Sequence, residues 1–185
     1  MSLASLASLV EEAGRRQRQH RGQTLLHVAG RWGRVEMVTF LLRAGFHRHV
    51  DVLDEKERTA LYLACQHGHL EVVRRLLEAN AAGDLATFVG LTPLYVACKK
   101  GHLEIVRLLV NAGADKDKAG EYGVTPLYVA CEIGHLEIVR LLVEAGADME
   151  KGGDRTPLLI ARYFGRIEVM RLLHEAGADS YGYEL

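Results

Sequence analysis

The residues of this chain whose types could do chemistry are three cysteines and nine histidines. The segment CQHGH brings Cys65, His67 and His69 close together in sequence, and thiolates and imidazoles are common zinc ligands. However, Cys98 and Cys131 follow Cys65 at successive intervals of 33 residues, which indicates a repeated packing position. We therefore interpret the cysteines as small buried apolar groups. We expect neither a metal ion nor a cofactor.

Known catalytic motifs are absent from the sequence. It contains no nucleophile-elbow pattern, no phosphate-binding glycine loop and no zinc-protease helix motif. His69, His102 and His135 each follow a glycine at the same period, so a repeat accounts for them without an active site. We predict a protein that is not an enzyme.

Composition and charge exclude several classes of function. The chain has 185 residues, of which 49% are hydrophobic and 25% charged, as in ordinary globular proteins. Its formal net charge of −1 predicts no general attraction to nucleic acid or to an acidic membrane. The apolar runs are too short to span a bilayer. The N-terminal stretch lacks the basic start and apolar core of a signal peptide.

The cysteine count bears on the compartment. An odd number of cysteines argues against a disulfide framework and for a reducing environment. We therefore expect a cytoplasmic or nuclear protein that is not secreted.

An internal repeat organises the chain. Five threonines recur at intervals of 35, 33, 33 and 31 residues: Thr24, Thr59, Thr92, Thr125 and Thr156. Nine residues after each threonine stands a glycine: Gly33, Gly68, Gly101, Gly134 and Gly165. Residues 92–115 and 125–148 differ at only three positions, where Lys99, Lys100 and Asn111 are replaced by Glu132, Ile133 and Glu144. A period of this length is typical of a repeat protein.

Each unit has the signals of two helices. The threonine can cap the first helix, and all three prolines, such as Pro93, directly follow such a threonine at the first helical position. The glycine supplies the left-handed residue that ends this short helix. The second helix, as in HLEIVRLLVEA, turns Ile138, Val139, Leu141 and Leu142 inward, and it ends at a glycine or, in the second unit, at Asn80.

The segment GVTPLYVACEIGHLEIVRLLVEAGAD resembles an ankyrin repeat, and the resemblance covers residues 22 to about 180. It implies an all-α repeat solenoid of helix-turn-helix units with β-hairpin-like loops. It also implies a concave face that is formed by the loops and the first helices. The expected units are 1–21 (a capping helix and a basic turn), the repeats 22–53, 54–86, 87–119 and 120–150, and 151–185 (repeat 5 and a tail).

The departures from the family pattern are also informative. Tyr62, Tyr95 and Tyr128 replace the usual histidine, which is retained at His27, and we assign the tyrosines to packing between repeats. The outer units are less regular than repeats 3 and 4, as expected of units that lack a neighbour on one side. The basic run 15–21 could be a nucleic-acid patch or a targeting signal, but we favour a solvated helix end.

The resemblance also implies where a partner would bind. In this family the loop tips and the ends of the first helices vary and meet partners, while the positions that carry the fold repeat. Aromatic and apolar residues at such positions are typical of an interface. The predicted partner-binding residues are Trp32, His67, Phe88, Val89, Leu91, Lys99, Lys100, Tyr122, Val124, Glu132, Ile133, Tyr163 and Phe164.

We therefore predict a non-enzymatic, monomeric interaction module that binds a protein or peptide through its concave face and loop tips. Neither nucleic acid nor a membrane is expected as a partner. Two alternatives stay open. One is an engineered or selected binder on the same scaffold, which the near-identity of repeats 3 and 4 permits. The other is a structural spacer or a fragment of a longer ankyrin array.

Overall fold

The protein is a stack of helix pairs, and its computed structural model describes residues 22–178. Within that range the first helices of the five pairs are α2 (Leu25–Arg31), α4 (Ala60–His67), α6 (Pro93–Lys100), α8 (Pro126–Ile133) and α10 (Pro157–Tyr163). The second helices are α3 (Val35–Arg43), α5 (Leu70–Glu78), α7 (Leu103–Asn111), α9 (Leu136–Glu144) and α11 (Ile167–Glu175). Two short 3₁₀ segments are η1 (Phe46–His49) and η2 (Glu121–Gly123). The expected capping helix and the basic run 15–21 lie outside the described residues.

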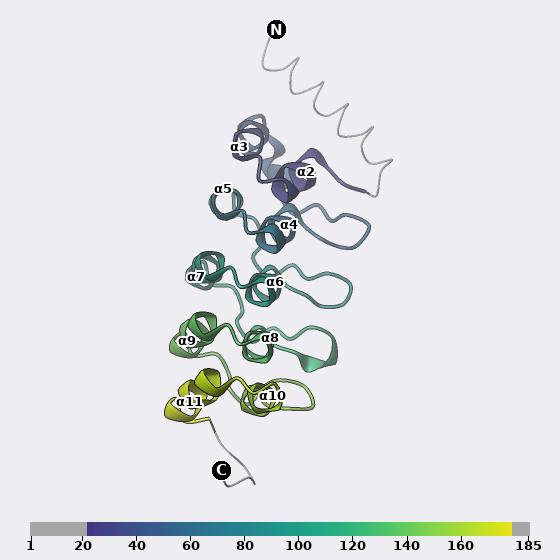
Figure 1. Cartoon of the computed structure of the whole chain (residues 1–185). Helices are drawn as coiled ribbons and strands as arrows, with labels where there is room; N and C mark the ends of the chain where they lie inside the picture. The colour runs from purple at the N-terminus through teal and green to yellow at the C-terminus, as the bar shows by residue number, and fades with distance from the viewer. Residues whose placement is uncertain (1–21, 179–185) are drawn as a thin grey trace.

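The helices form two columns (Figure 1). The first helices stack on one another, the second helices stack beside them, and the long loops project from the side of the first helices. Neighbouring first helices are in closer contact than neighbouring second helices, which curves the stack toward the first helices and their loops. We call the exposed surface formed by the C-terminal ends of the first helices and the loop tips the inner face. The predicted all-α solenoid is confirmed.

The sequence signals at the helix ends act as predicted. Each of the five threonines accepts a hydrogen bond at its side-chain oxygen from the backbone N–H three residues on, as in the 3.0 Å bond from Tyr62 to Thr59. Gly68, Gly101 and Gly134 end their helices in the left-handed conformation. Asn80 does the same for α5, with φ of 60°. These caps satisfy backbone groups that a helix leaves without partners inside itself.

His27, the one histidine retained at the position that tyrosine takes in repeats 2–4, connects repeat 1 to repeat 2. Its Nδ1 accepts from the Thr24 backbone N–H at 3.1 Å, so its Nε2 must carry the proton that is donated to the Arg58 carbonyl oxygen at 2.8 Å. Burial lowers the pKa of His27, which keeps the ring neutral. The first repeat is thereby tied to the loop of the second.

The three cysteines lie in the core. Cys65, Cys98 and Cys131 are each 0% exposed and are free thiols. Burial raises the pKa of all three thiols, so they stay protonated and unreactive. Tyr62 and Tyr95 are also buried, as expected of packing between repeats, whereas Tyr128 is half-buried.

The second helices are amphipathic. In α9, Ile138, Val139 and Leu142 are buried, whereas Leu141, which we expected to point inward with them, is only half-buried. Leu141 packs against the core without being enclosed by it. On the exposed side, weak ion pairs three residues apart join glutamates to arginines, as in the 3.8 Å contact between Glu137 and Arg140.

The loops before the first helices are hairpin-like, as predicted. In repeat 3 the Thr87 N–H donates to the Leu91 carbonyl at 3.1 Å, and the Gly90 N–H donates back to Thr87 at 2.7 Å. The equivalent pairs of bonds recur between Asp54 and Arg58 and between Gly120 and Val124. The hairpins hold the residues before each threonine in a fixed position relative to the helices.

Aspartates in the connections that follow the second helices join successive repeats. The Oδ1 atoms of Asp51, Asp84 and Asp117 accept hydrogen bonds from backbone amides one repeat further on, at 2.8–3.0 Å. These carboxylates therefore act as hydrogen-bond acceptors that hold neighbouring repeats together.

Candidate partner interface

A row of paired residues lies at the C-terminal ends of the first helices, one pair per repeat. The left-handed glycine that follows each pair ends the helix, so these side chains stand at its exposed tip. Trp32 is 67% exposed and Tyr163 68%, and His67, Lys99, Lys100 and Phe164 are also exposed. Each of the first three pairs of this row contains a basic residue, whereas the last two contain apolar or aromatic residues and Glu132; the pairs are Arg31 and Trp32, Gln66 and His67, Lys99 and Lys100, Glu132 and Ile133, and Tyr163 and Phe164.

Hydrogen bonds between repeats hold the row in place, and the sequence did not predict these bonds. His69 Nε2 lies 3.0 Å from the Arg31 carbonyl oxygen, and His102 bonds to the backbone of Gln66. In repeat 5 an arginine takes this role, because Arg166 Nε donates to the Glu132 carbonyl at 3.0 Å. Each first-helix end involved is thus fixed by the residue that begins the second helix of the next repeat. The recurrence of histidine after glycine was the sequence signal for this link.

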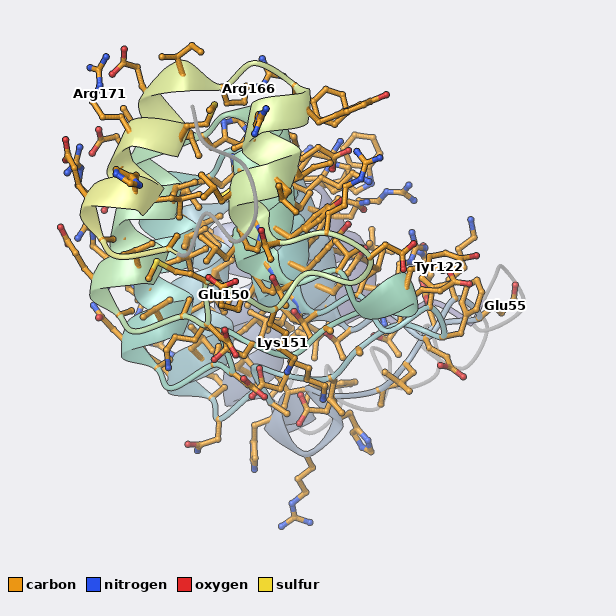
Figure 2. The ribbon with its side chains drawn as sticks, turned by 90° about the horizontal axis from the view of Figure 1, so that it is seen from below. Glu55, Tyr122, Glu150, Lys151, Arg166 and Arg171 are labelled. Atoms are coloured by element: carbon orange, nitrogen blue, oxygen red, sulfur yellow. The ribbon has the colours of Figure 1, made fainter. Side chains whose placement is uncertain are left out.

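The loop tips of repeats 3 and 4 display two aromatic side chains on a fixed backbone. Phe88 is 72% exposed and Tyr122 is 82% exposed. The Glu121 N–H donates to the Val89 carbonyl at 2.9 Å, which joins the two tips directly. In Figure 2, Tyr122 points outward on the loop side of the stack, opposite Arg171 of α11.

Tyr122 also has an unusual backbone conformation. Its φ is 62°, a left-handed value that a bulky residue rarely adopts. Position 153 in the neighbouring loop must be a glycine, because an added Cβ there would lie 2.2 Å from the Tyr122 carbonyl oxygen. Strain of this kind is typical of functional positions.

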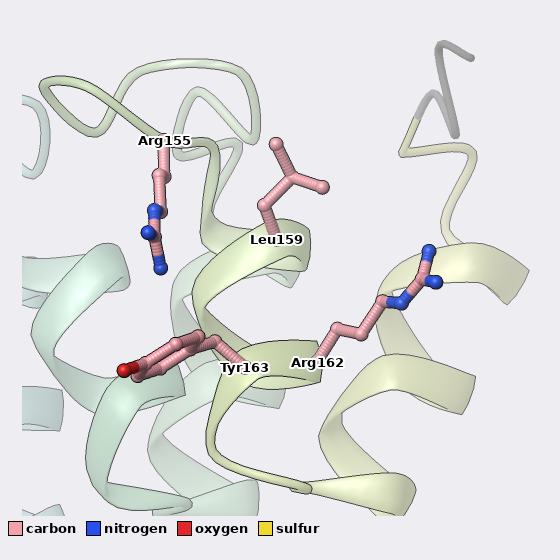
Figure 3. Close-up of a pocket in the computed structure, with 4 residues that line it drawn as sticks. All are labelled: Arg155, Leu159, Arg162 and Tyr163. Atoms are coloured by element: carbon pink, nitrogen blue, oxygen red, sulfur yellow. The ribbon is translucent and has the colours of Figure 1, made fainter. Parts of the chain in front are cut away.

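In repeat 5, Tyr163 lies between two neighbours. Its ring meets that of Phe164 edge to face, with centroids 5.1 Å apart, and the Arg155 guanidinium carbon lies 4.7 Å from its centroid. Figure 3 shows Arg155 directed at the Tyr163 ring, whereas Arg162 points away from it. A pocket of about 330 Å³ lies here, bordered by Arg155, Leu159, Arg162 and Tyr163. Arg155 had no predicted role beyond its place before Thr156.

Five of the predicted residues are less accessible than their places in the sequence implied. Leu91, Val124 and Ile133 are half-buried and pack against the core, and Val89 and Glu132 are half-buried too. Ile133 therefore has less surface for a partner than the exposed rings of Tyr163 and Phe164. The reason is that the helix ends and hairpins fold back onto the next repeat, which covers part of each residue.

No group of side chains suited to hold a metal ion occurs among residues 22–178. The rings of His67 and His69 stack with centroids 6.2 Å apart, but no group of three or more histidine, cysteine, aspartate or glutamate side chains converges there as metal ligands would. Cys65, the third residue of the CQHGH segment, is buried in the core.

A family model of ankyrin repeats, which spans three copies, matches residues 3–86, 46–120, 81–153 and 113–182. The chain belongs to the ankyrin repeat family. Ankyrin repeats are in general modules for protein–protein interaction, and the family is typically non-enzymatic. No helix in the described part of this ankyrin domain is both long and apolar enough to cross a membrane.

Proposed function

We propose that this ankyrin domain binds a protein or peptide partner through its inner face and loop tips, without catalysing a reaction. The supporting observation is a contrast between framework and surface. Repeats 3 and 4 are nearly identical in their caps and cores, yet two of their three differences are adjacent and lie in the row of helix ends. A protein that recognises a partner needs a constant framework and exposed positions that can vary.

The exposed aromatic residues are suited to be the anchors of this interface. Phe88 and Tyr122 project from loops that a hydrogen bond between repeats joins, and Tyr163 projects from the end of α10, where its ring contacts Phe164 and Arg155. Rigid aromatic side chains lose little entropy on binding, and truncation of a buried anchor often costs about 2 kcal/mol or more. Lys99 and Lys100 form a charged rim, which contributes more to the rate and specificity of association than to affinity.

A structural spacer is the competing function. A spacer needs the stacked core and the polar outer surface but has no use for large exposed rings at the loop tips. Phe88 and Tyr122 are more exposed than any other large apolar side chain of the described residues. Their exposure favours binding.

The test begins with affinity capture of partners by the full chain, followed by measurement of direct binding with each purified candidate. Ile133→Lys, Tyr163→Ala and Phe164→Ala change the row, and Phe88→Ala with Tyr122→Ala changes the tips. Arg171→Ala is the control, since Arg171 is exposed on the opposite side and its ion pair with Glu168 is a surface pair.

We expect at least one row or tip variant to weaken binding about tenfold or more, while the control binds as the wild type does. Ile133→Lys should lower the melting temperature only modestly, because Lys100 occupies the equivalent position in repeat 3 although Ile133 packs partly against the core. Equal affinity in all row and tip variants would refute the proposed interface. A large loss of stability in Tyr163→Ala or Phe164→Ala would instead mean that these rings close the end of the stack.

A further inference from the structure

Basic side chains of the inner face gather in repeats 1–3. Arg31 ends α2, His67 ends α4, and Lys99 and Lys100 end α6. Within residues 22–178, no ion pair engages Arg31, Lys99 or Lys100. In repeats 4 and 5 the corresponding positions hold Glu132, Ile133, Tyr163 and Phe164.

These basic groups are close enough to act on one another. The pKa of His67 is lowered by partial burial and then by the positive charges of Arg31, His69, Lys100 and Arg58. Arg31 belongs to α2, His69 directly precedes α5, Lys100 ends α6, and Arg58 lies in the loop before α4. Arg31 and Lys100 thus approach His67 from the repeats on either side of it, and the positive charge of the row comes from the arginine and the lysines.

One carboxylate near the row, that of Asp54, is paired within the fold, whereas Glu55 and Glu57 at the tip of the same loop are exposed. Asp54 is bound by the Arg58 guanidinium, with the Oδ2–Nη2 distance at 2.6 Å, and its Oδ1 accepts two backbone N–H groups. A chain with a net charge of −1 thus exposes unpaired positive charge at one end of its inner face.

We infer that the partner is an extended peptide with acidic residues that lie against repeats 1–3 and apolar residues that lie against repeats 3–5. This inference rests on the proposed function. Complementary charge selects the orientation and speeds the encounter, and the exposed rings of Phe88, Tyr122 and Tyr163 bury the apolar part.

Helix spacing sets the length of the peptide. Neighbouring packed helices lie roughly 10 Å apart, and an extended chain advances about 3.3 Å per residue. About three peptide residues therefore cover one repeat. The acidic part should span about six residues, and the residues that meet Tyr163 and Phe164 should follow about six further on.

A nucleic acid strand fits the same face less well. Its charge continues along its whole length, whereas the row turns from basic to Glu132 and then to apolar residues after repeat 3. The tip of the second loop adds the exposed carboxylates of Glu55 and Glu57. These charges belong to the same repeats as the basic residues, so they confine an acidic peptide segment to the helix ends, away from the tip of the second loop.

The experiment selects binders from a displayed library of random 15-residue peptides, a length that follows from about three residues per repeat, with the full chain as bait. The test variant is Lys99→Glu with Lys100→Ile, which gives repeat 3 the residues that repeat 4 already tolerates. The control is Arg107→Glu with Arg140→Gln. It makes the same change in net charge on the second helices, where both arginines form only weak pairs.

We expect the selected peptides to be enriched in aspartate and glutamate toward one end and in apolar residues toward the other. Their affinity should fall about tenfold or more in the test variant and less than about twofold in the control. It should also fall as the salt concentration rises, because the complementary charges are exposed.

Other results separate this inference from the proposed function. Peptides that need Tyr122 or Tyr163 but show no acidic enrichment and bind the test variant normally would overturn the inference alone. Failure to select any peptide would also overturn it, leaving a folded protein surface as the partner. Peptides that bind regardless of every inner-face substitution would contradict both. Tighter binding of a single-stranded RNA oligonucleotide, lost in the test variant, would assign the face to nucleic acid instead.

Discussion

Arg166 at the start of α11 donates a hydrogen bond from its Nε to the carbonyl oxygen of Glu132 at the end of α8, over 3.0 Å. It stands where repeats 2–4 have His69, His102 and His135, and it lies against Gly134 as those three histidines lie against the glycines of the preceding repeats. Arginine and histidine side chains both present an N–H group at a suitable reach. The last repeat is therefore joined to its neighbour by the same bond with different chemistry.

Arg166→Ala should destabilise the protein by about 1 kcal/mol, because the Glu132 carbonyl loses its donor. Arg166→His should recover most of that loss. Urea unfolding of the two variants tests this, with Arg171→Ala as a control that should change stability by less than about 0.5 kcal/mol. If the histidine variant is as unstable as the alanine variant, the two side chains are not equivalent.

Asp54 should make stability depend on pH in the acid range. Burial raises the pKa of Asp54, but the hydrogen bonds from Arg58, Lys56 and Gln23 together outweigh burial, and the pKa falls to about 2. The ionised carboxylate therefore stabilises the fold above its unfolded pKa of about 3.9, and this contribution is lost as the pH falls through about 2.

Asp54→Asn should accordingly lower the free energy of unfolding by about 1–2 kcal/mol at pH 7, since water screens part of the interaction. The difference from the wild type should shrink between pH 4 and pH 2. Denaturant titrations at several pH values measure it. A difference that is constant over this range would show that the carboxylate charge is not responsible.

The three thiols should be inaccessible in the native protein. Cys65, Cys98 and Cys131 are each 0% exposed, and only a thiolate reacts readily with a disulfide reagent. A thiol titration without reductant should find almost no reaction in native buffer and three reactive thiols after denaturation. Fewer than three thiols in the denatured protein, or stoichiometric zinc in a metal analysis, would contradict the packing role.

Two adjacent leucines of α9 should differ in their effect on stability. Leu142 is 0% exposed, so Leu142→Ala should cost about 2–5 kcal/mol by opening a cavity in the core. Leu141 is half-buried, so Leu141→Ala should cost about half as much, in proportion to the apolar area removed. Chemical denaturation of both variants measures the difference. Equal losses would mean that Leu141 is more tightly packed than its exposure indicates.

The stack should open from its ends. Repeats 3 and 4 have neighbours on both sides, and in repeat proteins each unit is stabilised by its neighbours. Native-state hydrogen exchange should therefore protect amides in residues 103–110 and 136–143 longest. Longer protection of residues 35–42 would reverse the order.

The sequence by itself determined the helices and their order. Thr92, Pro93 and Gly101 act on their own helix through caps and backbone dihedrals, so their effect can be read from spacing alone. The inward positions of the second helices follow from helical periodicity for the same reason, with Leu141 as the residue that periodicity placed too deep. The fixed period then identified the ankyrin family.

Only the tertiary structure decided how much of each variable residue is available to a partner. Ile133 and Tyr163 occupy neighbouring places in the row, yet the first packs partly against the core while the second is 68% exposed against Arg155. The gathering of Arg31 and Lys100 around His67 is likewise a result of stacking. The physical reason is that His67 lies about one repeat away from both Arg31 and Lys100, and the burial of Ile133 likewise depends on how the units pack and not on local sequence.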